Sequence, residues 1–306
     1  MKRYTLENEY LSVIIVPEMG GKSISVYEKG KQFELLAQPR PGYQEAYQKG
    51  TSFADCAAFG FDDAFPNIDG GSVLVDGKMI AYPDHGEIWS SPMEVISWDQ
   101  ERNTLELYYK SPLLQYGYEK KILLRDRTIV YAYRITNQGT AAFPFIWAFH
   151  CLVRYEEDMR ILFPKDTNTF TNVLQSSVLG KAGTQYQVEQ TKEGLTARNT
   201  NYRFDRVPEA KSRSMEKYYV SDAVKEGLCG YDYPSHEVRC RIRYDAAKLP
   251  WLGFFVTAGG FKGDYNCALE PSDGYYDSIE TALQNKRCPV AEPGEHKEFE
   301  IEIEIA

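Results

Sequence analysis

The chain has 306 residues, of which 43% are hydrophobic and 26% charged, and its formal net charge is −9 at pH 7. These fractions are typical of a folded protein, and the acidic balance argues against nucleic acid or an anionic membrane surface as a partner. The apolar run from Leu11 to Val16 is too short and too late for a signal peptide, and no run of about 18 apolar residues predicts a membrane span.

Alternation of apolar and polar residues with a period of two dominates the chain and predicts strands. In chain order the clearest alternating runs are 105–109, 129–135, 238–244 and 298–305. Turn signals separate the strands, such as Asp76-Gly77 and Pro293-Gly294-Glu295. The polar stretch 167–200 is typical of a long hairpin or loop region.

Helical periodicity is confined to two short segments, 43–49 and 209–218. Because strands do not alternate with long helices, a parallel α/β sheet is disfavoured. Neither a flexible linker nor a repeat divides the chain. The sequence therefore predicts an all-β protein, with one antiparallel domain over residues 1–306.

Six cysteines stand at positions 56, 151, 229, 240, 267 and 288, without a CxxC pair or a zinc-type spacing. Free thiols in a reducing compartment are the simplest account, so we expect a cytoplasmic protein. The signatures GxGxxG, P-loop, GxSxG and HExxH are missing, which removes the common nucleotide, serine-hydrolase and zinc-protease motifs.

The first segments that can carry chemistry lie in the first third of the chain. Asp62 and Asp63 are adjacent acids in the aromatic stretch 59–66; they can reach sugar hydroxyls, or they can begin a turn. His85 lies between two carboxylates in the segment 83–89. His85 and Glu87 would share one face of an extended segment, but two ligands without a third give a weak metal signal.

Two more candidates lie later in the chain. His150 ends the aromatic run 145–150, where a histidine with a purely structural role in the core is the alternative. Glu270 follows an apolar pair and precedes Pro271, which is typical of the last residue of a buried strand before a loop. A half-buried carboxylate costs free energy unless it is hydrogen-bonded or used, and a turn or an ion pair is the alternative here.

Together and in this order, these segments resemble the aldose 1-epimerase, or galactose mutarotase-like, family over nearly the whole chain. The segments that carry the resemblance are Pro17–Ile24, Asp84–Trp89, Trp147–His150, Leu249–Phe254, Leu269–Ser278, the Pro293-Gly294-Glu295 turn and the alternating last strand. The resemblance implies a large twisted antiparallel β-sandwich, the galactose mutarotase-like supersandwich.

The resemblance also implies an isomerase that interconverts the α and β anomers of a free aldose. Glu270 would be the general base, His150 the general acid, and His85 a substrate-binding residue near the ring oxygen. Such positioned groups each contribute about 10²–10⁴-fold in rate. The implied partner is a small sugar, with no cofactor and no metal, and the protein is expected to be a monomer or a homodimer.

Two departures from the family leave the identity of the sugar open. Galactose mutarotases place an arginine before the first histidine, whereas the segment 53–66 has none and offers Asp62 and Asp63. They also use an aspartate between the second histidine and the glutamate, where this chain has Glu216 and Lys217. Asp62 and Lys217 are therefore expected to bind the substrate, Lys217 as a donor to a hydroxyl.

Two other functions remain open from the residues. A non-catalytic sugar-binding protein of the same fold would not need an acid–base pair, so the joint presence of Glu270 and both histidines favours the enzyme. A glycoside hydrolase or lyase should show two carboxylates that flank the scissile bond. Here Glu270 has a credible place and Asp62 is a distant second.

Overall fold

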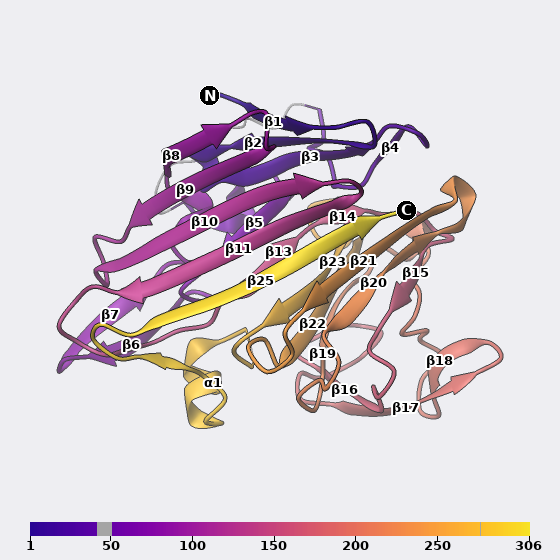
Figure 1. Ribbon diagram of the computed structural model, residues 1–306. Helices are drawn as coiled ribbons and strands as arrows, with labels where there is room; N and C mark the ends of the chain where they lie inside the picture. The colour runs from indigo at the N-terminus through magenta and orange to yellow at the C-terminus, as the bar shows by residue number, and fades with distance from the viewer. Residues whose placement is uncertain (42–50, 276) are drawn as a thin grey trace.

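The computed structural model describes residues 1–41, 51–275 and 277–306, and the helix expected over 43–49 lies outside them. Within these residues the strands form two large antiparallel sheets that lie one over the other (Figure 1). The all-β class predicted from the sequence is confirmed, as is the large twisted sandwich. The assignment of residues 1–306 to one domain stays a prediction.

The first sheet contains 13 strands in the described residues. Across the sheet they are β1 (Tyr4–Glu7), β2 (Leu11–Val16), β3 (Lys22–Glu28), β5 (Phe61–Ala64), β13 (Ala148–Cys151), β23 (Tyr265–Ser272), β22 (Trp251–Ala258), β19 (Met215–Val220), β16 (Thr169–Asn172), β17 (Gln185–Thr191) and β18 (Gly194–Ala197), with β4 (Phe33–Glu34) beside β3 and β14 (Val153–Arg154) beside β23.

The second sheet contains eight strands in the same residues: β15 (Arg160–Leu162), β20 (Leu228–Tyr233), β21 (Val238–Tyr244), β25 (His296–Ile305), β11 (Thr128–Asn137), β10 (Tyr116–Arg125), β9 (Thr104–Lys110) and β8 (Glu94–Asp99). Two small sheets pair β6 (Gly71–Val75) with β7 (Lys78–Tyr82) and β12 (Phe143–Pro144) with β24 (Val290–Ala291).

The helical elements are short. They are the α-helix α1 (Ile279–Gln284) and the 3₁₀ turns η1 (Pro17–Met19), η2 (Phe53–Asp55), η3 (Ile88–Ser90), η4 (Ala210–Ser212) and η5 (Pro234–His236). In the part of the chain that the structure describes, no helix has the length and apolar character needed to cross a membrane.

The alternation in the last strand shows how the core forms. On β25, Phe299, Ile301, Ile303 and Ile305 are buried, and the intervening glutamates face outward. On the facing side of the first sheet, the ring of Phe61 packs edge-on against Tyr131 of β11 at 4.7 Å between centroids. Apolar side chains of the two sheets therefore meet in one layer between them, as expected for a sandwich.

The helix expected over 209–218 is wrong. Only Ala210–Ser212 form a 3₁₀ turn, and β19 begins at Met215. This strand pairs with β16 on one side and with β22 on the other. Hydrogen bonds to two neighbouring strands thus override the weak helical pattern, as tertiary context often does. The hairpin expected within 167–200 is confirmed by β16, β17 and β18.

Candidate active site

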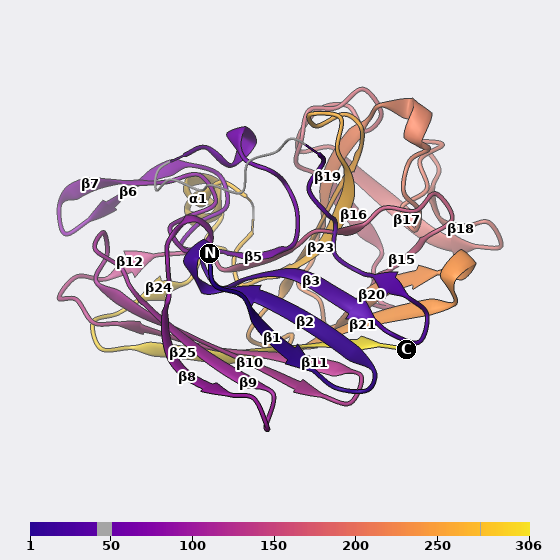
Figure 2. The same ribbon diagram turned by 90° about the horizontal axis from the view of Figure 1, so that it is seen from above.

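Residues directly opposite each other on antiparallel strands point to the same face of a sheet. In the first sheet the registers of the strands place one row of such residues across six neighbouring strands: Lys22, Asp62, His150, Glu270, Gly253 and Tyr219. We call the face that bears this row the site face. It lies opposite the second sheet, and Figure 2 shows α1 and the β6–β7 hairpin on that side.

His150 and Glu270 become neighbours through strand register. β13 pairs Ala148 with Ser272, and β14 continues the same register by pairing Val153 with Cys267. This register places His150 opposite Glu270, a position that corresponds to roughly 5 Å between Cβ atoms on paired antiparallel strands. The two residues are 120 positions apart in the chain, so only the sheet brings them together.

Glu270 lies within β23 rather than at its end. The strand continues through Pro271, opposite Leu252, to Ser272. The expectation that the strand ends at Glu270 is therefore wrong, because pairing with β22 holds the two following residues extended. Glu270 was expected to be half-buried, and the residue is in fact fully buried, with 1% exposed.

The adjacent acids of β5 point to opposite faces, as alternation along a strand requires. Asp63 points into the core, where it pairs with Lys120 at 2.8 Å and accepts a hydrogen bond from the Tyr133 hydroxyl at 2.9 Å. Asp62 points to the site face, where its Oδ2 lies 3.2 Å from Lys22 Nζ and 3.8 Å from His150 Nδ1. The structure places Asp62 beside His150 on the neighbouring strand, buried and paired.

His150 occupies a buried position with opposing electrostatic influences. Burial lowers the pKa of its imidazole, the neighbouring Asp62 carboxylate and Glu270 oppose that shift, and the net direction is downward. Since Nδ1 faces Asp62, ring geometry directs Nε2 away from it. The distance of 3.8 Å between His150 Nδ1 and Asp62 Oδ2 is too long for a hydrogen bond. Asp62 therefore orients the ring through electrostatic attraction.

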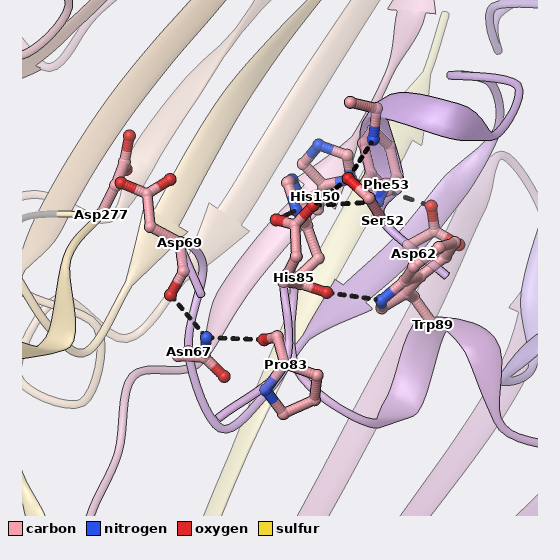
Figure 3. Close-up of polar contacts among 12 residues, drawn as sticks. Ser52, Phe53, Asp62, Asn67, Asp69, Pro83, His85, Trp89, His150 and Asp277 are labelled. Atoms are coloured by element: carbon pink, nitrogen blue, oxygen red, sulfur yellow. Dashed lines mark hydrogen bonds and ion pairs between the residues drawn. The ribbon is translucent and has the colours of Figure 1, made fainter. Parts of the chain in front are cut away.

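His85 is held beside His150 by a short loop (Figure 3). Its Nδ1 lies 2.7 Å from Asp84 Oδ1, and its ring stacks on Phe53 with 4.1 Å between centroids. Asp84 also accepts the Phe53 backbone N–H, and its carbonyl accepts the indole N–H of Trp89. The ring centroids of His85 and His150 are 5.0 Å apart, so the structure brings the two histidines together.

Lys217 reaches Glu270 from β19. Its Nζ lies 3.0 Å from Glu270 Oε2 and 3.1 Å from Asp277 Oδ2, and the hydroxyl of Tyr219 donates to Asp277 Oδ1 at 2.6 Å. Burial alone lowers the pKa of Lys217, but the carboxylates of Asp277 and Glu270 outweigh it and raise that pKa. Lys217 is therefore a charged ammonium between two carboxylates.

Gly253 on β22 makes this arrangement sterically feasible. It stands in the row between Glu270 and Tyr219, and a Cβ at this position would lie 3.0–3.3 Å from the Tyr219 ring. The missing side chain lets the aromatic ring lie over the strand with its hydroxyl aimed at Asp277.

The sequence thus predicted the residues that meet on the site face but missed several of their partners. Lys22, Asp84, Tyr219 and Asp277 were not singled out. The available signals were a lysine at the first position of the strand 22–28 and the aspartate within the 269–278 segment. Their pairings join residues 40 and 60 positions apart, which no local pattern reveals.

The metal alternative at His85 and Glu87 finds no geometric support in the described residues. Glu87 turns into the core, where it accepts hydrogen bonds from the hydroxyls of Ser111 and Tyr109. Residue Gly86 intervenes with φ +75°, so the segment is not extended and the two side chains do not share a face. In the described ranges, no three His, Cys, Asp or Glu side chains gather as a metal site.

A surface hollow of about 690 Å³ lies elsewhere, over the outer face of the second sheet. Its charged lining is paired across strands, with Lys121 on Glu106 and Arg134 on Glu298. Exposed ion pairs of this kind are typical of a sheet face in contact with solvent. The residues that line this hollow include no histidine, whereas the site face brings His85, His150 and Glu270 together.

No sequence-family model matches the chain, and no curated protein matches it by sequence. Solved structures do match its fold. A galactose mutarotase-like protein from Lactobacillus casei superposes with a TM-score of 0.73 at 14% identity, covering 100% of both chains. A provisionally named aldose 1-epimerase from Escherichia coli K12 superposes with a TM-score of 0.71 at 18% identity, covering 100% of this chain and 99% of that one.

A galactose mutarotase-like protein from Clostridium acetobutylicum gives a TM-score of 0.70 at 14% identity and covers 99% of this chain and 94% of its own. The chain therefore has the galactose mutarotase-like fold over its whole length, as the sequence resemblance predicted. At these identities the likeness concerns the fold, and the function has to be argued from the site residues.

Proposed function

We propose that this protein is an aldose 1-epimerase, an isomerase that interconverts the α and β anomers of a free aldose. The observation that carries the proposal is the position of His150 opposite Glu270 on paired strands, with His85 beside them. One acid and one base on the same face are what the opening of a sugar hemiacetal requires.

In the proposed reaction Glu270 removes the proton of the C1 hydroxyl while His150 gives a proton to the ring oxygen. The C1–O5 bond breaks and leaves an open-chain aldehyde. Rotation about the C1–C2 bond then presents the other face of the carbonyl. The C5 hydroxyl attacks that face and returns its proton to His150, and Glu270 returns its proton to the former carbonyl oxygen.

Unsatisfied atoms on the site face support the binding of a hydroxyl-rich ligand. Neither carboxylate oxygen of Glu270 has a hydrogen bond of good geometry, although Lys217 is ion-paired with one of them. Buried polar atoms are nearly always hydrogen-bonded, and exceptions call for an explanation. A sugar hydroxyl that donates to Glu270 would satisfy this acceptor.

A non-catalytic sugar-binding protein is the second candidate, and one observation favours it. Glu270 is 1% exposed and ion-paired with Lys217, so a sugar can reach this carboxylate only after the side chains above it shift. A binder would not require that shift. The experiment below separates the two functions.

Replacing Glu270 by glutamine tests the enzymatic proposal. Freshly dissolved α-anomers of several aldoses, with D-glucose and D-galactose among them, are followed by polarimetry with and without protein. We expect the wild-type protein to accelerate mutarotation of at least one hexose. Glu270→Gln should lower that rate by about 10²–10⁴-fold, the contribution of a positioned base.

Glu119→Gln is the matched control, because Glu119 is exposed on the second sheet, and it should keep the full rate. If no aldose is accelerated above its spontaneous rate, the epimerase proposal fails. Full activity in Glu270→Gln would instead show that the base has been assigned to the wrong residue.

We also propose a cytoplasmic location. All six cysteines are free thiols, which supports a reducing compartment. Whether the protein is a monomer or a homodimer stays a prediction.

A further inference from the structure

Lys217 lies in the stretch that resembles the one where galactose mutarotases carry an aspartate toward the sugar, and this resemblance first suggested that it binds a sugar hydroxyl. Its contacts in the structure point inward instead. The ammonium group bridges Glu270 and Asp277 at 3.0 and 3.1 Å, and only 12% of the side chain is exposed. The ammonium group of Lys217 is thus already paired with two carboxylates, with which a sugar hydroxyl would have to compete.

We propose that Lys217 acts on Glu270 rather than on the sugar, as a positioning residue that keeps the base carboxylate ionised and oriented. This inference rests on the proposed function and deepens it. A cation about 3 Å from a carboxylate favours the ionised form of the acid, and more strongly where water is largely excluded. The base is therefore held ready to accept a proton.

Asp277 gives Lys217 an anchor that lasts through the reaction. When Glu270 takes the C1 proton it becomes neutral, and its ion pair with Lys217 weakens. Asp277 is anchored separately by the Tyr219 hydroxyl at 2.6 Å, and it retains the ammonium group at 3.1 Å. Lys217 therefore stays in place to favour deprotonation of Glu270 when the ring closes again.

The competing role, Lys217 as a sugar ligand, makes a different prediction. Loss of a ligand weakens binding and raises KM, with little effect on how the rate depends on pH. Loss of a positioning cation instead removes the charge that opposes protonation of Glu270. The acidic limb of the pH profile then moves to higher pH, and the rate lost relative to wild type grows as the pH falls.

The test compares wild type, Lys217→Met and Lys217→Arg in kcat, KM and kcat/KM across pH. We expect the acidic limb of Lys217→Met to move upward by about 1–3 pH units, the range for removing an opposite charge at this distance. KM should change less than about three-fold, since the lost group does not bind the sugar. Lys217→Arg keeps the cation and should restore the wild-type limb at least in part.

A second readout does not depend on catalysis. The side-chain carboxyl of Glu270 is titrated by carbon-13 NMR and assigned by its loss in Glu270→Gln. Its midpoint should rise in Lys217→Met and stay unchanged in Lys121→Met, a control on the outer face of the second sheet, where Lys121 pairs with Glu106. Circular dichroism identifies any variant that fails to fold. If Lys217→Met does not fold, the comparison of Lys217→Arg with wild type provides the test.

The two ideas can fail separately. An inactive wild-type protein whose Glu270 midpoint still responds to Lys217 would end the epimerase proposal and leave the ion-pair coupling standing. An active protein in which Lys217→Met raises KM ten-fold or more and leaves both the limb and the Glu270 midpoint unmoved would show that Lys217 is a sugar ligand, which overturns the inference.

Discussion

At the scale of single residues, the proposed proton donor, His150, depends on its immediate surroundings. His150 lies between Asp62 and Glu270 on neighbouring strands, and burial lowers the pKa of its imidazole below the ordinary value of 6.5. A general acid must carry its proton to act. The fraction of protein with a competent acid therefore falls as the pH rises through that lowered pKa.

The burial of His150 predicts how the catalysed rate falls on the alkaline side of the pH profile. With the spontaneous rate subtracted, kcat/KM should fall as pH rises, with a midpoint below 6.5. Asp62→Asn should move this midpoint further down, because the carboxylate beside Nδ1 favours the imidazolium. Initial rates measured by polarimetry between pH 4 and 8 provide the check.

Asp76→Asn removes the same charge from the exposed β6–β7 turn and should leave the profile unchanged. A wild-type midpoint at or above 6.5, or a midpoint that does not respond to Asp62→Asn, would contradict this account of His150.

At the scale of elements, the loop before η3 positions His85. The His85 N–H donates to the Ile68 carbonyl at 2.6 Å, and Glu87 N–H donates to that of Phe65 at 2.8 Å. Gly86 between them has φ +75°, and a Cβ there would overlap the Phe65 backbone. A side chain at this position must therefore push the loop away from Phe65, the residue directly after β5.

Gly86→Ala should displace His85 and lower kcat/KM by about 10²-fold, the usual effect of a 1 Å misplacement near the reacting groups. Gly77→Ala is a matched control. Gly77 has a similar φ of +71°, but no atom lies within 4 Å of the added Cβ. Steady-state kinetics of both variants provide the measurement. Equal losses of kcat/KM in the two variants would contradict a specific role for the 83–87 loop.

The strands differ in how well the sequence predicts them. Strands with one buried face, such as β25, can be predicted because every second residue is apolar. β19 does not, since Glu216 and Lys217 interrupt its pattern and both faces are largely covered. Its extended form comes from pairing with β16 and β22, which local propensity cannot reveal.

At the scale of the whole molecule, a buried ion pair joins the two sheets directly behind the site. Lys120 of the second sheet and Asp63 of the first are both fully buried at 2.8 Å, next to the residue that faces His150. Burial raises the pKa of Asp63, and the lysine opposes that shift. Removing one partner leaves a buried charge without compensation.

Lys120→Met should therefore lower the free energy of unfolding by about 3–5 kcal/mol at pH 7. Urea denaturation measures this loss. Lys121→Met, the next residue on β10, removes a lysine whose side chain is 50% exposed, and it should cost less than about 1 kcal/mol. A loss below 1 kcal/mol for Lys120→Met would show that the pair does not stabilise the packing of the sheets.

The sandwich itself could be predicted from alternation and from the family-like segments. The site could be predicted only in part. His85, His150 and Glu270 stand in recognisable segments, whereas the partners of His150 and Glu270 come from strands distant in the sequence. Lys22 meets Asp62 through the order of strands in the sheet, and Asp277 reaches Lys217 of β19 from the loop between β23 and α1. The sequence displays neither relation.

The central claim is that Glu270 and His150 open and close a sugar ring. Two-dimensional exchange NMR on an equilibrated aldose measures this directly, from cross-peaks between the two anomeric protons. We predict exchange that grows in proportion to wild-type protein and returns to the spontaneous rate with Glu270→Gln. Sugar signals that shift or broaden with wild-type protein, while exchange stays at the spontaneous rate, would contradict the claim and identify a sugar-binding protein instead.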